Sequence, residues 1–594
     1  MSSQALTAAS PRMSDAPPAP GRVGPHPATL GIASGVLLWF AFPPAAWSWL
    51  GWVALAPLFL LVTSRRRRAT IYLGAWAGGL AFWLLALSWI LCIDPAAALG
   101  WGAMSLALSA LWPIAVAVAR VGVIGLKLPV MVAAPVAWVA VEYVRAYLAT
   151  GFPWYYLAHT QYRLLPLIQV ADFSGALGLS LLMAGANAFL ADALTLPLLR
   201  PTSRGPRLTR AIAVRAGCLA AALAFTVGYG LFRLGSSKFE PGPRVALLQS
   251  NLMQRAKESK TIEEVLAIYA GGKDEPGLVR RAATQAPKPD LIVWSETAYP
   301  FGVLEVDPKL PADVMGRLAD QYVPGWTAAD IESKRAGVEN YLHGWVDAIG
   351  VPMMVGSTTS TFRPTGLTRY NSAVLIEPGV PAWRSYHKLH LVPFGEYVPL
   401  IKTFSWLSAL TPYRDGRIPT LAFGEKPSWF DLGKYRYATA ICFEDTVPQV
   451  VRRLVREVDD GRSPDVLLNL SNDGWFTYLD EDGQVHASSE QEMHLAGSVF
   501  RAVEHRVPLA RAANTGISAV VDGDGRVVAS VPAAVEDVLV REIPLDPRTG
   551  LYTAWGDWVG QGCLAISIGI VPLRWWRRRP SPGEIRGRQP SPRG

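Results

Sequence analysis

The stretch Ala438-Thr439-Ala440-Ile441-Cys442-Phe443-Glu444-Asp445 runs from apolar residues into a thiol and two carboxylates. A short apolar run of this kind is typical of a strand that is buried on both faces, and the polar residues after it mark the strand end. Cys442 is also the one cysteine of four that stands in polar sequence. We therefore expect a layered α/β domain that carries a thiol at the end of a strand.

Similar runs lie on both sides of this stretch and alternate with helical patterns, which extends the α/β prediction over most of the C-terminal half. The sequence also contains a hairpin signal, Gly523-Asp524-Gly525, between two apolar runs. The strands are expected at Val245–Asn251, Leu291–Glu296, Met353–Ser357, Ser372–Ile376, Tyr437–Glu444 and Val466–Ser471, the hairpin over Gly516–Val521 and Arg526–Ser530, and helices at 262–284, 311–320, 331–348 and 487–505.

Two further strand ends carry groups that complement a thiol. One apolar run ends in Glu296, and Tyr386–Glu396 presents Lys388, then a Pro-Phe-Gly turn, then Glu396. A nearby cation lowers the pKa of a thiol, and a carboxylate can accept its proton. The sequence therefore predicts a site for covalent catalysis where these strand ends converge.

Each group has an expected role. The thiolate would attack a carbonyl carbon, and Glu296 would accept the thiol proton and return it to the leaving group. Lys388 and the backbone N–H of Phe443 would stabilise the oxyanion, a contribution of roughly 3 kcal/mol per donor in comparable sites. Glu396 and Glu444 would orient the lysine or shape the pocket.

The chain as a whole is too apolar for a soluble protein. Of its 594 residues, 51% are hydrophobic and 17% are charged, whereas about a quarter of the residues of a soluble domain are charged. Long uncharged runs predict α-helical membrane spans. We expect about eight, at 28–43, 46–63, 70–92, 96–119, 125–147, 166–191, 211–232 and 556–574, the last with Trp558, Trp575 and Trp576 as interfacial anchors.

The basic residues indicate the orientation, because Lys and Arg accumulate in cytoplasmic loops. They lie in segments that all fall on one face of the expected bundle. Removing those segments (+18) and the rest of the membrane half (−2) from the overall +9 leaves residues 233–573 with a net charge of −7. The basicity is therefore a sign of membrane topology, and we expect no nucleic-acid binding.

Eight spans put both termini in the cytoplasm and the long segment before the last span outside. The expected parts are a disordered tail at 1–27, a seven-span bundle at 28–232, an extracytoplasmic catalytic domain at 233–555, a last span at 556–575 and a basic cytoplasmic tail at 576–594. The four scattered cysteines suit neither a disulfide framework nor a zinc site, so we expect no metal and no cofactor.

Several motifs of the chain resemble the nitrilase superfamily, whose site is a Glu-Lys-Cys triad on an α-β-β-α sandwich. With its flanking spans, from about residue 28 to 575, the chain resembles the apolipoprotein N-acyltransferases. The resemblance implies that Glu296, Lys388 and Cys442 form the triad and that Glu396 and Glu444 match carboxylates essential in the family. The motifs are Trp294–Pro300, His387–Pro399, Ala440–Glu444, Ser471–Phe476 and Asn514-Thr515-Gly516-Ile517.

The resemblance also implies a reaction and its partners. The thiolate would take an acyl chain from a phospholipid such as phosphatidylethanolamine, and the N-terminal diacylglyceryl-cysteine of an apolipoprotein would receive it on its α-amine. We expect a monomer in the bacterial inner membrane. Trp475, Asn472 and Trp154 would contact the substrate, although the tryptophans equally suit interfacial anchoring.

The chain departs from the family pattern at three places. Glu258 follows Lys257 where a tryptophan is usual, Ser295 replaces a proline, and Tyr478–Gln484 is an acidic insertion after Trp475. The insertion lies near the expected entrance, where it would affect substrate preference or gating. His494 is expected to pack in a helix or to face solvent rather than to take part in the chemistry.

Two alternatives remain. A membrane-tethered carbon–nitrogen hydrolase would use the same triad with water, but a soluble amide needs no membrane bundle. A transporter with an accessory domain would need paired ionisable residues within its spans. Its candidates Glu142, Arg145, Asp172 and Asp192 lie mostly near span ends.

Overall fold

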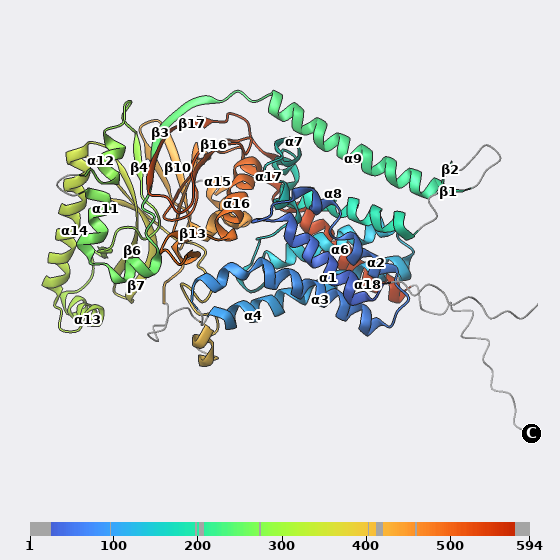
Figure 1. Cartoon of the computed structure of the whole chain (residues 1–594). Helices are drawn as coiled ribbons and strands as arrows, with labels where there is room; N and C mark the ends of the chain where they lie inside the picture. The colour runs from blue at the N-terminus through green and yellow to red at the C-terminus, as the bar shows by residue number, and fades with distance from the viewer. Residues whose placement is uncertain are drawn as a thin grey trace, which may run out of the picture.

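The computed structural model describes residues 25–94, 97–195, 199–200, 207–271, 275–401, 403–410, 420–457 and 460–576. Figure 1 shows two adjoining parts, a bundle of helices and a lobe built on two sheets. Helix α9 (Arg210–Gly235) runs along the bundle and leads into the lobe. The two expected tails lie outside the described residues, apart from 25–27 at one end and residue 576 at the other.

Apolar helices form the bundle. Four described helical stretches are long and apolar enough to cross a membrane, namely Arg68–Ala86, Ala97–Gly125, Ala171–Thr195 and Arg210–Gly235, and shorter apolar helices cover Pro27–Ala41, Ser48–Thr63 and Trp558–Leu573. All eight expected spans overlap helices, but their number as true spans stays a prediction. The remaining bundle elements are α1 (Pro27–Ala41), α2 (Ala56–Thr63), α3 (Arg68–Ala86), α4 (Ala97–Ser109), α5 (Leu111–Arg120), α6 (Val130–Arg145), α7 (Leu165–Ile168), α8 (Ala171–Thr195) and α18 (Trp558–Trp576).

Helices α1 and α3 approach each other through glycines. A Cβ atom added to Gly31 would lie 1.9 Å from the carbonyl oxygen of Gly74, and one added to Gly35 would lie 2.2 Å from that of Gly78. Gly31 and Gly35 on α1 are four residues apart, as are Gly74 and Gly78 on α3, and this spacing lets helix backbones touch in membranes. The glycines therefore set the distance between these two helices.

The lobe contains a seven-stranded and a six-stranded sheet. The first has the order β17-β3-β4-β6-β7-β8 with β5 beside β6, and the second has the order β16-β15-β14-β11-β10-β9. The strands are β3 (Glu240–Gln249), β4 (Leu291–Val293), β5 (Val303–Val306), β6 (Met353–Arg363), β7 (Gly366–Ile376), β8 (Arg384–His387), β9 (Trp429–Leu432), β10 (Tyr435–Ile441), β11 (Val466–Ser471), β14 (Leu509–Ala513), β15 (Ser518–Val521), β16 (Val527–Val531) and β17 (Asp537–Leu545).

The two sheets face each other and helices cover their outer faces, as the α-β-β-α prediction requires (Figure 1). Along β3, Val245 and Leu247 join the core shared with the six-stranded sheet, whereas Ala246 and Leu248 join the core under the helices. This alternation is the two-residue period of a strand buried on both faces. The helices are α10 (Gln254–Ser259), α11 (Ile262–Ala270), α12 (Leu278–Ala283), α13 (Ala312–Tyr322) and α14 (Ala328–Ile349) on one side, and α15 (Pro448–Arg456), α16 (Ser489–His505) and α17 (Leu551–Trp555) on the other.

Some expected boundaries are wrong. The single helix expected at 262–284 is two helices, because Gly271 takes φ +90° and the chain bridges to Pro276 before α12 begins. The strand expected at 437–444 ends at Ile441, and the 3₁₀ turn Cys442–Thr446 follows it. The expected hairpin is confirmed as the antiparallel pair β15 and β16.

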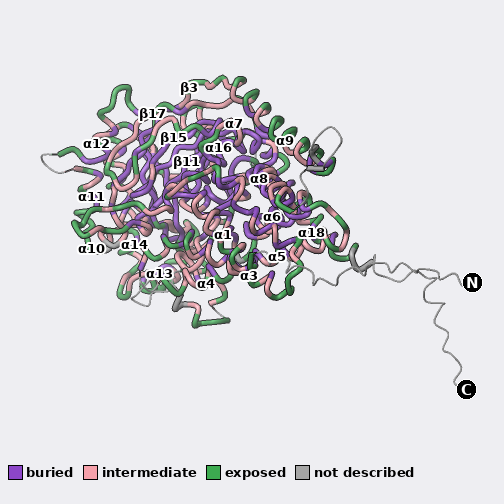
Figure 2. Tube along the Cα trace, turned by 45° about the vertical axis from the view of Figure 1, so that its right-hand side comes forward, coloured by how far each residue is buried: buried purple, intermediate pink, exposed green. Residues whose placement is uncertain are grey.

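The bundle and the lobe join through α16, which packs against α8. Figure 2 shows buried residues filling the centre of the molecule from β11 through α16 to α8. The fully buried Arg506 pairs with Asp172 of the bundle at 2.6 Å and with Asp524 of the lobe at 3.0 Å. Arg233 at the end of α9 pairs with the same Asp172 at 2.7 Å. These ion pairs tie three segments of the chain together at the junction.

Candidate active site

Three strand ends bring the expected triad together. Glu296 follows β4, Lys388 follows β8, and Cys442 follows β10. The first two strands belong to the seven-stranded sheet and the third to the six-stranded sheet. The site therefore lies where the carboxyl ends of strands from both sheets meet.

Lys388 is the centre of the charged group. Its side chain is only 1% exposed, and its Nζ lies 3.1 Å from Oε1 of Glu296 and 3.0 Å from Oε2 of Glu396. Burial opposes the charge on this ammonium group, yet the two carboxylates together raise the pKa of Lys388 well above its usual value. Lys388 is therefore a fixed cation throughout the physiological range.

Asn371 hydrogen-bonds to the same two carboxylates that contact Lys388. Its Nδ2 donates to Oε1 of Glu296 at 2.6 Å and to Oε1 of Glu396 at 2.7 Å. The backbone N–H of Asn472 donates to the second oxygen of Glu296 at 2.9 Å. Both oxygens of Glu296 are thus fixed. No local pattern points to Asn371, because its contacts depend on how β7 pairs with β8.

Cys442 has a strained backbone conformation. Its φ is +51°, which costs a residue with a side chain about 1–3 kcal/mol. Burial and the nearby Glu296 carboxylate raise the pKa of the thiol well above its usual value, whereas Lys388 lowers it. The resting group is therefore a thiol, and a base must remove its proton.

Glu444 links the chain after β8, at Lys388, to the end of β10, at Cys442. It is completely buried, and it accepts hydrogen bonds from the backbone N–H groups of Leu389 at 2.6 Å, His390 at 2.9 Å and Ile441 at 2.7 Å. The hydroxyl of Tyr386 donates to it as well. Burial raises the pKa of Glu444 to about 7. These contacts give Glu444 a positioning role.

Aromatic rings connect the turn Cys442–Thr446 to the bundle. The half-buried Phe443 stacks between His390, at 5.9 Å, and Trp154, at 6.3 Å between ring centroids. Trp154 is 4% exposed, and its Nε1 donates to Oγ1 of Thr446 at 2.8 Å. Trp475 is half-buried in the turn Asp473–Trp475. The expected substrate contacts of Trp154, Trp475 and Asn472 stay predictions.

Lys257 and Ser295 lie beside the triad's first strand end. The ammonium group of Lys257 donates to the carbonyl oxygen of Thr297, next to Glu296. The side chain of Glu258 lies outside the described residues. The acidic insertion forms a small hairpin of its own, β12 (Thr477–Leu479) and β13 (Val485–Ala487).

A buried polar cluster lies behind Cys442. His494 is 1% exposed within α16, so of the two expectations helix packing is confirmed and a solvent-facing position is wrong, because partners from three other elements surround it. Its Nε2 lies 2.7 Å from Oδ1 of Asp445, and Nη2 of Arg511 lies 2.9 Å from its Nδ1 and 2.6 Å from Asp473. Nothing in the local sequence connects these residues, which are up to 66 positions apart.

The same cluster contains a metal-like arrangement. One ligand atom each of Asp473, Glu490 and His494 lie within 4.8 Å of one another. The Arg511 guanidinium, however, already donates to Asp473 and to the imidazole of His494. A cation in this place would meet that positive charge, so the donor set does not fit a metal ion.

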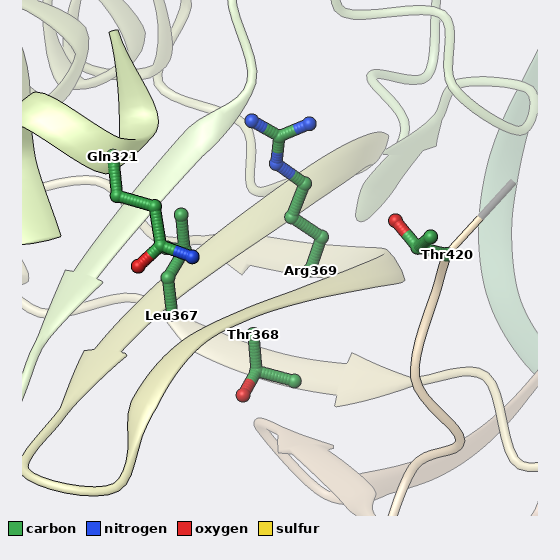
Figure 3. A pocket seen from close by; sticks show the side chains of 5 residues that line it. All are labelled: Gln321, Leu367, Thr368, Arg369 and Thr420. Carbon is green, nitrogen blue, oxygen red and sulfur yellow. The ribbon is translucent and has the colours of Figure 1, made fainter. Parts of the chain in front are cut away.

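A surface cavity of about 270 Å³ opens further along β7 (Figure 3). It is lined by Gln321 of α13, by residues of β7 that include Arg369, and by Thr420. Arg369 is two residues from Asn371 on the same strand, and Leu421 donates its N–H to the carbonyl oxygen of Glu396 at 3.0 Å. None of the triad residues lines this cavity, which is therefore a neighbour of the site and not the site itself.

The ionisable residues named for a transporter have structural partners. Glu142 accepts a hydrogen bond from the N–H of Leu157 at 2.8 Å, and Arg145 donates to the carbonyl oxygen of Phe152 at 2.9 Å. Asp192 pairs with Arg215 at 2.9 Å, and Asp172 belongs to the junction described above. These contacts hold helices and loops together.

The comparisons with known proteins cover both parts of the chain. The family model for the apolipoprotein N-acyltransferase N-terminal domain matches residues 34–189, and the carbon-nitrogen hydrolase model matches residues 244–550. An apolipoprotein N-acyltransferase of Geobacter metallireducens is 33% identical over 92% of this chain and 95% of its own length. Its counterpart in Rhodopirellula baltica is 28% identical over 92% of this chain and 97% of its own length.

Some solved structures are similar to part of this chain. Nit3 of Saccharomyces cerevisiae, a nitrilase superfamily member, is 17% identical with a TM-score of 0.33, and covers 54% of this chain and 97% of that chain. An amidase from Nesterenkonia sp. is 17% identical with a TM-score of 0.32, and covers 54% of this chain and 99% of that chain.

Proposed function

Because the chain belongs to the apolipoprotein N-acyltransferase family and is an acyltransferase, we propose that it works through a thioester on Cys442. The acyl donor in this proposal is a phospholipid such as phosphatidylethanolamine. The acceptor is the α-amine of the N-terminal diacylglyceryl-cysteine of an apolipoprotein. The observation that carries the proposal is the convergence of the buried Glu296 and Lys388 with the half-buried Cys442 at adjoining strand ends.

In the first half of the reaction, Glu296 accepts the thiol proton and the sulfur attacks the ester carbonyl of the donor. A carbon–sulfur bond forms, and the negative charge on oxygen meets Lys388 and the N–H of Phe443. When the intermediate collapses, the carbon–oxygen bond breaks and Glu296 gives the proton to the lysophospholipid. The raised pKa of the Cys442 thiol supports this order, because a protonated thiol needs a base.

In the second half, the amine attacks the thioester. A carbon–nitrogen bond forms and the carbon–sulfur bond breaks, while Glu296 takes a proton from the amine and returns it to the sulfur. Glu396 and Asn371 hold Lys388 and Glu296 in place through both halves. Trp154, Trp475 and Asn472 are assigned to the substrate side of the site.

The chain belongs to this family, and four helices among its described residues are long and apolar enough to cross a membrane, so it is an inner-membrane protein. We propose the orientation from the charge distribution, with residues 233–555 outside and the expected tails at 1–27 and 576–594 in the cytoplasm. The bundle at 28–232 and the span at 556–575 would deliver lipid-anchored substrates. The contact of Trp154 with Thr446 supports this, since it joins the turn Cys442–Thr446 to the bundle.

The test is to incubate the purified enzyme with labelled phosphatidylethanolamine and to search for an acyl adduct on Cys442 by mass spectrometry. Adding a diacylglyceryl peptide should remove the adduct and acylate the peptide amine. Cys442→Ala and Glu296→Gln should insert normally and give no adduct. Full transfer by Cys442→Ala would overturn the mechanism, and release of free fatty acid without amine transfer would indicate a hydrolase.

A further inference from the structure

The carbonyl oxygen of the nucleophile residue is held by two side chains. Nδ2 of Asn469 donates to the oxygen of Cys442 at 3.0 Å, and Nε2 of His494 lies 3.3 Å from the same oxygen. Asn469 comes from β11 and His494 from α16, so two separate elements converge on one backbone atom. Both side chains are buried, at 0% and 1% exposure.

The donors have fixed orientations. Nη1 of Arg511 donates to Oδ1 of Asn469 at 2.8 Å, which leaves the NH₂ end of that amide to face Cys442. Nε2 of His494 faces the oxygens of Asp445 and Cys442, which only accept, so this nitrogen carries a proton. Arg511 and Asn469 are also paired across β14 and β11, which sets their distance.

The held carbonyl belongs to the same peptide unit as the N–H of Phe443. Because a trans peptide is planar, its N–H points opposite to its C=O. Two donors that fix the oxygen of Cys442 therefore fix the direction of the Phe443 N–H. Phe443 is the second residue of the 3₁₀ turn Cys442–Thr446, where an N–H has no acceptor within the turn, and among the described residues no backbone carbonyl outside the turn accepts from it. This N–H is therefore available to a substrate oxygen.

We propose that Asn469 and His494 are positioning residues: by holding the carbonyl oxygen of Cys442, they aim the Phe443 N–H at the substrate oxygen that becomes negative when the thiolate attacks. This rests on the proposed thioester function. Arg511 hydrogen-bonds to both Asn469 and His494. The Cys442 backbone, at φ +51°, is kept in place by the same contacts.

The sharpest test is Asn469→Asp. The new carboxylate keeps the contact with Arg511 but places an acceptor where Cys442 needs a donor. Direct loss of an oxyanion donor lowers kcat by roughly 100- to 1,000-fold, so an indirect effect of about 10- to 100-fold is expected on thioester formation, with KM changed less than about twofold. Alkylation of Cys442 by iodoacetamide forms no oxyanion, so its rate and its pH profile should remain as in the wild type.

A second pair of variants tests the other donor. His494→Leu should lower kcat like Asn469→Asp, and His494→Gln, which keeps an N–H donor, should recover part of the loss. Ser498→Ala is the matched control, because it removes a hydrogen bond to Asp445 in the same cluster without touching the Cys442 carbonyl. It should retain wild-type kcat within about twofold, and all variants should elute as monodisperse protein.

The outcomes separate the two proposals. If the wild type forms no adduct on Cys442, the thioester function fails. If the wild type forms it and Asn469→Asp and His494→Leu do so at the same rate, the positioning role is refuted. If alkylation slows as much as thioester formation, the contacts act on the sulfur and not on the Phe443 N–H, which also refutes the proposal.

Discussion

Replacing Lys388 with methionine removes the cation that lies between the buried carboxylate of Glu296 and the half-buried carboxylate of Glu396. At about 3 Å and an effective dielectric constant of about 20, each contact with Glu296 and Glu396 has a gross attraction of about 5 kcal/mol, which desolvation partly offsets. Removing one partner of a buried ion pair typically costs about 3–5 kcal/mol. For a lobe of this size, that free energy lowers the melting temperature by roughly 4–8 °C. Lys388→Met should therefore be both inactive and less stable.

A double variant shows whether the excess charge is the cause. In Lys388→Met/Glu396→Gln one of the two carboxylates is gone, so the protein should melt at least about 2 °C above the single variant. The assay is thermal unfolding in detergent, followed by tryptophan fluorescence, beside the labelled-lipid assay on the same samples. The reasoning is refuted if Lys388→Met melts within 1 °C of the wild type, or if the double variant gains nothing over it.

Three further variants test other features. The folded-state pKa of Glu444, about 7, lies above its unfolded value, so the stability that its protonated form contributes is fully present below pH 4.5 and is lost as the pH rises to 7. The loss over this range is about 3 kcal/mol. The melting temperature of Glu444→Gln should therefore depend less on pH than that of the wild type. Gly31→Val should lower stability by about 1–3 kcal/mol, while Gly102→Ala, which meets no atom within 4 Å, should not; equal melting of the two would contradict the glycine contact. Trp154→Ala should slow acylation up to about tenfold through the lost ring contact, and Trp154→Phe should retain most of the rate; no difference between them would exclude a role for the ring.

The elements that sequence predicts well are those with a strong local pattern. The apolar runs before Glu296 and Cys442 are strands as expected, whereas Lys388 follows β8, whose residues Arg384–His387 form no apolar run. The three side chains converge because the carboxyl ends of these strands lie together. The helix expected at 262–284 fails at Gly271, where the apolar period continues but the backbone conformation does not. Hydrophobic periodicity indicates which face of a helix or strand is buried, but it does not indicate where the chain turns within an apolar run.

The residues that hold the site in place could not be predicted from the local sequence, for a different reason. Asn371 and Asn469 are ordinary polar residues in buried strands, and only the strand register brings them to Glu296 and Cys442. His494 finds its partners on strands and turns that lie far from it in the sequence. Contacts of this kind are set by the packing of two sheets and a helix, which no spacing in one segment encodes.

The first and last strands of the lobe, β3 and β17, lie side by side and run in opposite directions. The chain therefore enters the lobe after α9 and leaves it toward α17 and α18 at one edge of one sheet. A lobe whose first and last strands lie side by side can be connected to two membrane helices without any change in its strand order.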